Sequence, residues 1–198
     1  LFKERYGLML REDGIVMDDG TTTRISENHY HMTTTTAQAA NVLSHLEYYL
    51  QIVWPELNVN VVSTTEQWAG AAIAGPKSRD MLSKLYPDLD VSNEALPFMG
   101  YKEAEFFGVP SRIFRISFSG ELAYEINVKS DHGMFMWEKM MEVGKEFGNQ
   151  PYGTEALSTL RIEMGHVAGP ELDGRTIPSD VSLNGLVSKK KDFIGKNS

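Results

Sequence analysis

Alternating apolar and polar positions near the start of the chain predict a series of β-hairpins. Asp13-Gly14 is a strong turn signal between two extended runs. Asp19-Gly20 predicts a second turn, and the Thr-rich runs that follow it are β-branched and favour strands. The expected strands, in chain order, are 6–11, 15–17, 21–26 and 30–35.

Apolar residues at helical spacing predict a helix after these hairpins. Ala39, Leu43, Leu46 and Leu50 fall on one helical face, and Pro55 is expected to end the helix. Three more helices are expected after Gly75-Pro76, after Ser130-Asp131, and from Thr154 to Met164. Further extended runs are 57–62, 65–73, 101–107, 111–118 and 122–128.

Helices and strands do not alternate strictly, and hairpins dominate the chain. This order predicts an α+β fold with antiparallel sheets and packed helices, and it argues against a doubly wound parallel sheet. The chain of 198 residues is long enough for one core or for two smaller subdomains, about 1–90 and 91–198. The glycine-rich phosphate-binding motifs of nucleotide folds are absent.

Composition narrows the function classes. A net charge of -8 argues against nucleic acid as a partner, because phosphate binding depends on clustered Lys and Arg. The chain has no Cys, which excludes disulfides and thiolate chemistry, and its histidines show no metal-ligand spacing. No apolar run is long enough to predict a membrane span, and no signal peptide is visible. We therefore expect a cytoplasmic protein with no metal site.

Glu125 is the first candidate for chemistry. Period-two alternation puts Tyr124 and its apolar neighbours on one face of a strand and Glu125 on the other. A three-residue loop at 119–121 predicts Arg115 opposite Glu125, and the pair would contribute about 0.2–1 kcal/mol. Alternatively, the carboxylate accepts two N–H groups from a planar heterocycle such as a pterin.

Arg161 and the two adjacent aspartates are the other candidates. Arg161 borders an apolar helical stripe, so its head either reaches water or is buried with an anionic partner or ligand. Asp18 and Asp19 either form a turn before Gly20, or repel one another and have a raised pKa if they are partly buried.

Three segments resemble motifs of the glycine-cleavage T-protein (aminomethyltransferase) family, in that family's order. They are Met17-Asp18-Asp19, 115–125 and 160–165. The resemblance covers essentially the whole chain and implies an aminomethyltransferase folate-binding fold. It also implies that the chain is truncated at both ends, without a preceding flavin-related region and without the family's C-terminal barrel.

Finer details resemble one branch of that family, the folate-binding region of the alpha subunit of heterotetrameric sarcosine oxidase. The segments are 32–36, 74–79, 165–174 and 188–195. This implies that tetrahydrofolate captures the methylene group of oxidised sarcosine as 5,10-methylenetetrahydrofolate, in an oxidoreductase whose flavin, NAD and other subunits lie outside this chain. The isolated piece should not oxidise sarcosine. The alternatives are a glycine-cleavage aminomethyltransferase and a non-catalytic assembly scaffold.

The resemblance also implies roles for individual residues. Glu125 matches the carboxylate that holds the pterin, and Arg161 matches the arginine of the following helix. Asp19, or else Asp18, matches the catalytic aspartate, while Tyr124 and Thr34 are weaker candidates for lining the pocket. Two departures from the aminomethyltransferase pattern stand out, at Gly20, where the family has an apolar residue, and at Met32-Thr33-Thr34, where it has Val-Val-Asn.

Overall fold

The computed structural model describes residues 3–197 and divides into two compact units. Unit 1 consists of Arg24–Asn28 and Thr64–His166, together with the chain up to Glu4. Unit 2 consists of Arg5–Thr23 and His29–Ser63, together with the chain from Val167 onward. Residue 90, near the expected subdomain boundary, falls inside unit 1. The two units interleave in sequence.

Unit 1 is built on a four-stranded antiparallel sheet with the strand order β4-β7-β6-β5. Its strands are β4 (Trp68–Ala74), β5 (Tyr101–Phe106), β6 (Val109–Phe114) and β7 (Ala123–Lys129). The link between β5 and β6 is only Phe107-Gly108, both at positive φ. Such a turn matches the twist of the flanking strands, so it fixes the register of this hairpin.

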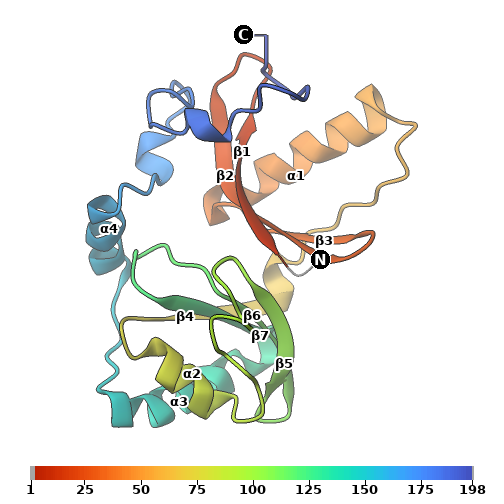
Figure 1. Cartoon of the computed structure of the whole chain (residues 1–198). Coiled ribbons are helices and arrows are strands. Elements are labelled where there is room, and N and C mark those ends of the chain that lie inside the picture. The colour runs from red at the N-terminus through yellow and green to blue at the C-terminus, as the bar shows by residue number, and fades with distance from the viewer. Residues whose placement is uncertain (1–2, 198) are drawn as a thin grey trace. The chain divides into compact units, whose positions relative to one another are not determined.

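Two helices, α2 (Ser78–Leu85) and α3 (Gly133–Gly144), cover one face of this sheet (Figure 1). The core between them is made by alternate residues of the strands, such as Ile126 and Val128, packed against helix residues. Met136 and Met140 of α3 are buried in it. Met134 and Trp137 of the same helix are exposed.

The last long helix of unit 1 is α4 (Thr154–Glu163). Gly165 has a φ of 75° just beyond it, a backbone conformation that ends helices and favours glycine. The short 3-10 helices of the chain are Thr36–Gln38, Thr65–Gln67, Ser130–His132, Lys145–Phe147, Gly169–Glu171 and Asn184–Leu186.

Unit 2 contains most of a three-stranded sheet with the order β1-β2-β3. Its strands are β1 (Glu4–Leu10), β2 (Val16–Ser26) and β3 (His29–Met32). They are followed by α1 (Ala39–Tyr48), which continues as a π-helical turn over Tyr49–Val53 and stops before Pro55, as expected. The α+β class with antiparallel sheets is therefore confirmed in both units.

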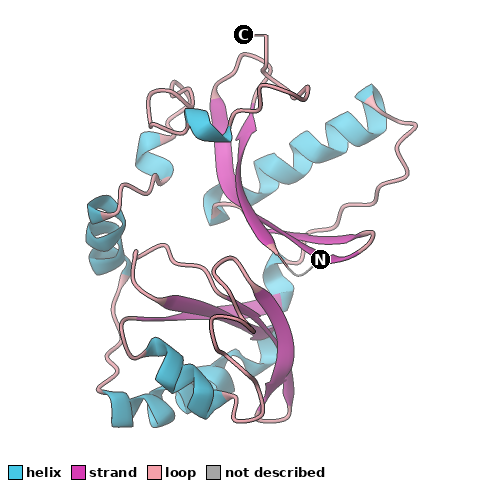
Figure 2. Cartoon of the chain, viewed as in Figure 1, coloured by secondary structure: helices cyan, strands magenta, loops and turns pink. Residues whose placement is uncertain are grey.

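Two local expectations are wrong. Asp19-Gly20 forms no turn, because β2 continues through it as one long strand. Gly20 is needed for a different reason: a Cβ at this position would overlap the carbonyl oxygen of Thr33. The expected strand at 57–62 is an exposed loop without a partner strand, drawn in pink between α1 and β4 in Figure 2.

Candidate functional site

Glu125 lies near the start of β7, on the sheet face that points away from α2 and α3. Its neighbours across the sheet are Ala72 of β4 and Phe114 of β6. The residues on either side of it, Tyr124 and Ile126, are fully buried in the core on the opposite face. The alternation predicted from the sequence therefore holds along this strand.

The Glu125 carboxylate has no hydrogen-bond or ion-pair partner among residues 3–197. Burial raises the pKa of this carboxyl, because the charged form is poorly solvated there. Burying a charge without a partner is costly, so natural proteins rarely keep one that has no use. The group is left free to accept hydrogen bonds from a ligand.

The predicted Arg115–Glu125 ion pair is wrong by one residue of register. Phe114 stands opposite Glu125, and the Arg115 Nη1 donates to the carbonyl oxygen of Leu96 at 2.8 Å. A slip of one residue moves a side chain to the other face of the sheet. The loop between β6 and β7 is longer than the three residues expected, since β6 ends at Phe114 and β7 starts at Ala123.

A second arginine, Arg112, lies on the same face of the sheet as Glu125 but contacts other residues. Its Nε lies 3.8 Å from the Glu103 carboxylate, and its Cζ lies 4.0 Å from the centre of the Trp68 ring. The Tyr101 hydroxyl donates to the same Glu103 at 2.5 Å. Neither Arg112 nor Arg115 therefore neutralises the charge of Glu125.

Tyr124 lies on the other side of the strand from Glu125. Its side chain is 0% exposed and belongs to the core between the sheet and the two helices. The Arg79 guanidinium carbon lies 5.9 Å from the centre of its ring. Tyr124 consequently does not share the face of the Glu125 carboxylate.

Arg161 is the one buried side chain of α4, with 7% of its surface exposed. Its head is therefore buried, and the alternative in which it reaches water is wrong. Its Nη1 donates to the carbonyl oxygen of His166 at 3.1 Å, and the His166 N–H donates back to the carbonyl of Arg161 at 2.9 Å. The arginine thus holds the chain that leaves α4.

His166 and Phe118 connect the end of α4 to the loop that precedes β7. Their rings stack with centroids 5.8 Å apart, and the His166 Nδ1 lies 2.9 Å from the Phe118 carbonyl oxygen. In the same loop, a Cβ on Gly120 would overlap the Met164 side chain. Sequence reasoning missed these contacts, because nothing in the local pattern links positions so far apart.

Asp18 and Asp19 occupy successive positions in β2 of unit 2, so their side chains point to opposite sides of the strand. Asp18 is 1% exposed and accepts the backbone N–H of Thr35 at 3.0 Å. Asp19 is half-buried and accepts the Tyr6 hydroxyl at 2.7 Å. The turn interpretation of this pair is therefore wrong.

The environment of Asp19 tunes its ionisation. Burial raises its pKa and the charge of Asp18 adds to that rise, while the hydrogen bond from Tyr6 opposes it. The pKa of the Tyr6 hydroxyl is raised in turn, chiefly by burial and then by Asp19. Tyr6 was not predicted from the sequence, although its place in the adjacent strand makes it a natural partner.

Thr34 is half-buried in unit 2, and its hydroxyl donates to the carbonyl of Thr35 at 3.2 Å. The neighbouring Thr33 hydroxyl lies 2.8 Å from that of Thr21. Because Gly20 lies directly against the Thr33 carbonyl, the two departures from the aminomethyltransferase pattern belong to one close contact between β2 and the chain after β3.

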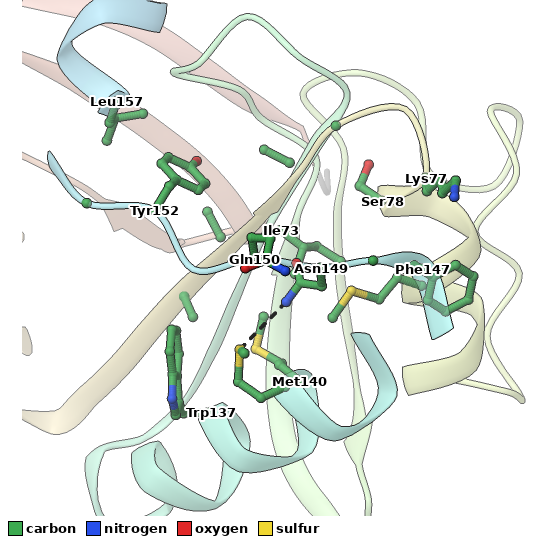
Figure 3. Close-up of a pocket in the computed structure, with 18 of the residues that line it drawn as sticks. Ile73, Lys77, Ser78, Trp137, Met140, Phe147, Asn149, Gln150, Tyr152 and Leu157 are labelled. Atoms are coloured by element: carbon green, nitrogen blue, oxygen red, sulfur yellow. Dashed lines mark hydrogen bonds between the residues drawn. The ribbon is translucent and has the colours of Figure 1, made fainter. Parts of the chain in front are cut away.

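Unit 1 also contains a cavity of about 610 Å³ beside the outer edge of β4 (Figure 3). Small β4 residues such as Gly70 and Ala72 leave the space, and Trp137, Tyr152 and Leu157 form part of its walls. The Asn149 side chain donates to the Met141 sulfur there at 3.7 Å. The cavity suits an apolar group, and none of the predicted site residues lines it.

Across residues 3–197, no three His, Cys, Asp or Glu side chains gather where they could hold a metal ion. No helix within the same range has the length and apolar character needed to cross a bilayer.

Comparison with known proteins identifies relatives along almost the whole chain. It is 52% identical over 197 residues to the sarcosine oxidase subunit alpha of Rhizobium meliloti (strain 1021), covering 98% of the chain and 20% of that relative. It is 32% identical over 198 residues to an aminomethyltransferase of Chloroherpeton thalassium, covering 99% of the chain and 53% of that relative. The chain thus spans about a fifth or about half of these proteins.

The fold agrees with a solved structure of the glycine cleavage system aminomethyltransferase T from Bartonella henselae. The TM-score is 0.77 at 23% identity, over 96% of this chain and 48% of that one. The family model described as the GCVT N-terminal domain matches residues 3–191. The chain therefore belongs to the GCVT N-terminal domain family, the family of the glycine-cleavage T-protein.

Proposed function

We propose that this chain binds tetrahydrofolate and forms the part of a sarcosine oxidase alpha subunit that captures a one-carbon unit. The observation that carries the proposal is the partly buried Glu125 carboxylate, which has no partner among residues 3–197. An ionised carboxylate only accepts hydrogen bonds, and its two oxygens match two neighbouring N–H donors of a pterin ring. Partial burial strengthens such bonds relative to those in water.

Arg161 is proposed to act on the same unit of the protein through its buried head. It is fixed to His166, and His166 stacks on Phe118 of the loop before β7. We assign it to holding this loop in the conformation that leaves the Glu125 face open. Tyr124 has no place in this proposal as a pocket residue, because it faces the core.

Asp19 is proposed as the residue that orients the amine and helps to move protons as the folate N5 attacks the methylene carbon. Because the pKa of its carboxyl is raised, Asp19 holds and exchanges a proton more readily than an ordinary aspartate. Asp18 is assigned a structural role, because it is buried and bound to the backbone of Thr35. Thr34 remains a proposed lining residue in the segment after β3.

The relatives favour the sarcosine oxidase branch. Identity to two sarcosine oxidase alpha subunits is 52% and 50%, against 32% for the aminomethyltransferase of Chloroherpeton thalassium. The proposed product is 5,10-methylenetetrahydrofolate, formed from the methylene iminium that flavin-dependent oxidation of sarcosine yields. The flavin, the NAD and the other subunits of the proposed heterotetramer lie outside this chain.

A glycine-cleavage aminomethyltransferase is the second candidate, because it belongs to the same family. A purely structural scaffold is less well supported: it predicts that Glu125 pairs with an arginine, and neither Arg115 nor Arg112 pairs with it.

The choice between sarcosine oxidase and aminomethyltransferase is tested by giving the complete subunit assembly different one-carbon donors and comparing the rates of transfer. We expect 5,10-methylenetetrahydrofolate to form from sarcosine in the presence of tetrahydrofolate, and no transfer from an aminomethylated lipoyl carrier. Transfer from the lipoyl carrier at a rate equal to or above that from sarcosine would contradict the oxidase assignment.

A further inference from the structure

Three hydrogen-bond donors gather at one end of unit 1, on the core side of the sheet. They are the Tyr124 hydroxyl, the Arg115 guanidinium and the Arg79 guanidinium, which we call the donor cluster. The Tyr124 side chain is 0% exposed and its hydroxyl has no partner among residues 3–197. The Nε of Arg115 is buried and likewise without a partner in that range.

Arg115 directly follows the end of β6, and Tyr124 lies near the start of β7. Phe114 and Glu125 form the last cross-strand pair of these two strands, so Arg115 and Tyr124 are the sequence neighbours of that pair. The backbone of Arg115 keeps its strand-like bonds, donating to the carbonyl of Gly100 at 2.9 Å and accepting from the N–H of Met99 at 2.9 Å. The Arg115 charge is close enough to act on the Tyr124 hydroxyl and lower its pKa.

Arg79 reaches the same place from the first turn of α2. Its guanidinium carbon is 5.9 Å from the centre of the Tyr124 ring. The two arginines are also the only charged groups in the described chain that shift the pKa of the Tyr124 hydroxyl, which burial raises and both arginines lower. The cluster therefore has two positive charges beside one phenol.

The known partners of these arginines are all neutral. Arg115 Nη1 donates to the Leu96 carbonyl at 2.8 Å, while Arg79 donates to the Val91 carbonyl and to the Asn93 Oδ1, the latter at 2.7 Å. No carboxylate among residues 3–197 lies within ion-pair distance of either arginine. Guanidinium groups cannot accept hydrogen bonds, so the unpaired Nε and the hydroxyl require an acceptor that the protein does not provide.

We propose that the donor cluster is a binding site for an anion, in which the Tyr124 hydroxyl and the Arg115 Nε donate to one acceptor and Arg79 supplies additional positive charge. The ligand class is an acceptor-only anionic group, a carboxylate or an inorganic oxyanion, or chloride in their absence. Buried polar groups in native proteins almost always have a hydrogen-bond partner, which is a protein group, a water molecule or an ion. Two positive charges at one place favour an anion as that partner.

This site is separate from the proposed pterin site. Glu125 and Tyr124 are neighbours in β7 and point to opposite faces of the sheet. An anion in the donor cluster is therefore expected to bind without tetrahydrofolate and without the Glu125 carboxylate. Failure of either proposal leaves the other intact.

The test is chloride-35 NMR of the full chain, in which binding to protein broadens the free-ion signal. We expect saturable broadening that acetate or phosphate displaces, and the more effective competitor identifies the ligand as a carboxylate or an oxyanion. Arg115→Gln should weaken chloride binding about tenfold, because a hydrogen bond to a charged group is lost. Tyr124→Phe, which removes only the hydroxyl, should weaken it about threefold and keeps the test valid if Arg115→Gln does not fold.

Arg112→Gln is the matched control, because Arg112 is on the same strand segment but faces Glu103 and Trp68 on the other side of the sheet. It should leave the broadening unchanged. The proposal is overturned if the wild-type chain gives no saturable broadening, or if Arg112→Gln reduces the broadening as much as Tyr124→Phe does.

Discussion

At the scale of single residues, the main feature is an ionisable group that the fold does not neutralise. Glu125 is partly buried beside Phe114 and Ala72, while the nearest arginines bind a carbonyl oxygen and another glutamate. Such a group lowers the stability of the folded chain whenever it is ionised. Its presence is explained if a ligand supplies the missing donors.

Glu125→Gln should therefore stabilise the chain while removing its folate binding. The pKa of Glu125 is raised in the folded state, so its neutral form favours folding at low pH, and that contribution is lost as the pH rises above the unfolded value of about 4.3. The variant should match the wild type near pH 4 and melt about 2–4 °C higher at pH 7, a difference of about 1 kcal/mol. Thermal unfolding followed by circular dichroism at both pH values checks this. A variant that melts below the wild type at pH 7 would contradict this, because it would show that other groups of the protein already stabilise the ionised Glu125 when no folate is bound.

The hydrogen bond from Tyr6 should set the pH dependence of one-carbon transfer. This bond lowers the pKa of Asp19 against the effects of burial and Asp18, so Tyr6→Phe should raise that pKa further. In the complete enzyme, the acid limb of the rate of methylenetetrahydrofolate formation should move to higher pH. Tyr48→Phe, at an exposed position in α1, serves as the control and should leave the profile unchanged. If the acid limb of the Tyr6→Phe profile does not move, Asp19 does not take part in the proton transfer.

At the scale of elements, the sequence predicted which segments are strands and helices better than it predicted their pairing. Alternation placed Glu125 on the correct side of β7, because the burial of Tyr124 and Ile126 follows directly from residue type. The partner of Glu125 depended on the length of the loop before β7, which leaves no periodic signal. The predicted register was wrong by one residue: Phe114, and not Arg115, stands opposite Glu125. The carboxylate therefore has no ion-pair partner where the sequence predicted one.

Gly20 shows a different limit of sequence reasoning. Asp-Gly usually indicates a turn, yet here the glycine lies inside β2 because the Thr33 carbonyl comes too close for any side chain. That requirement involves a residue of another segment and cannot be seen in the local pattern.

Gly20→Ala should destabilise the fold, because the added methyl group overlaps the Thr33 carbonyl and the backbone has to move. We expect a loss of about 1–3 kcal/mol in the free energy of unfolding. Gly7→Ala in the neighbouring strand β1 is the matched control, since a Cβ there meets no heavy atom within 4 Å, and it should change stability by less than about 1 kcal/mol. Urea denaturation measures the free energy of unfolding of both variants. Equal stabilities would contradict the close contact between Gly20 and Thr33.

At the scale of the whole molecule, the order of strands and helices predicted the class of fold, while the family resemblance assigned roles to the candidate site residues. The division into two units follows neither the midpoint of the chain nor a visible linker, because segments distant in sequence belong to one unit. Contacts such as Arg161 with His166, and His166 with Phe118, required the three-dimensional structure. The carboxylate and the arginine singled out from the sequence both lie in unit 1, where Glu125 is partly buried and Arg161 is buried.

Calorimetric titration of the chain with tetrahydrofolate, alongside Glu125→Ala and Asp19→Asn, tests the central claim most directly. We expect binding by the wild type and a loss of about a hundredfold in affinity for Glu125→Ala, because two hydrogen bonds to a charged group disappear. Asp19→Asn should bind within about threefold of the wild type, since its role is in transfer. Wild-type affinity in Glu125→Ala, or equal losses in both variants, would contradict the assignment of Glu125 as the residue that holds the pterin.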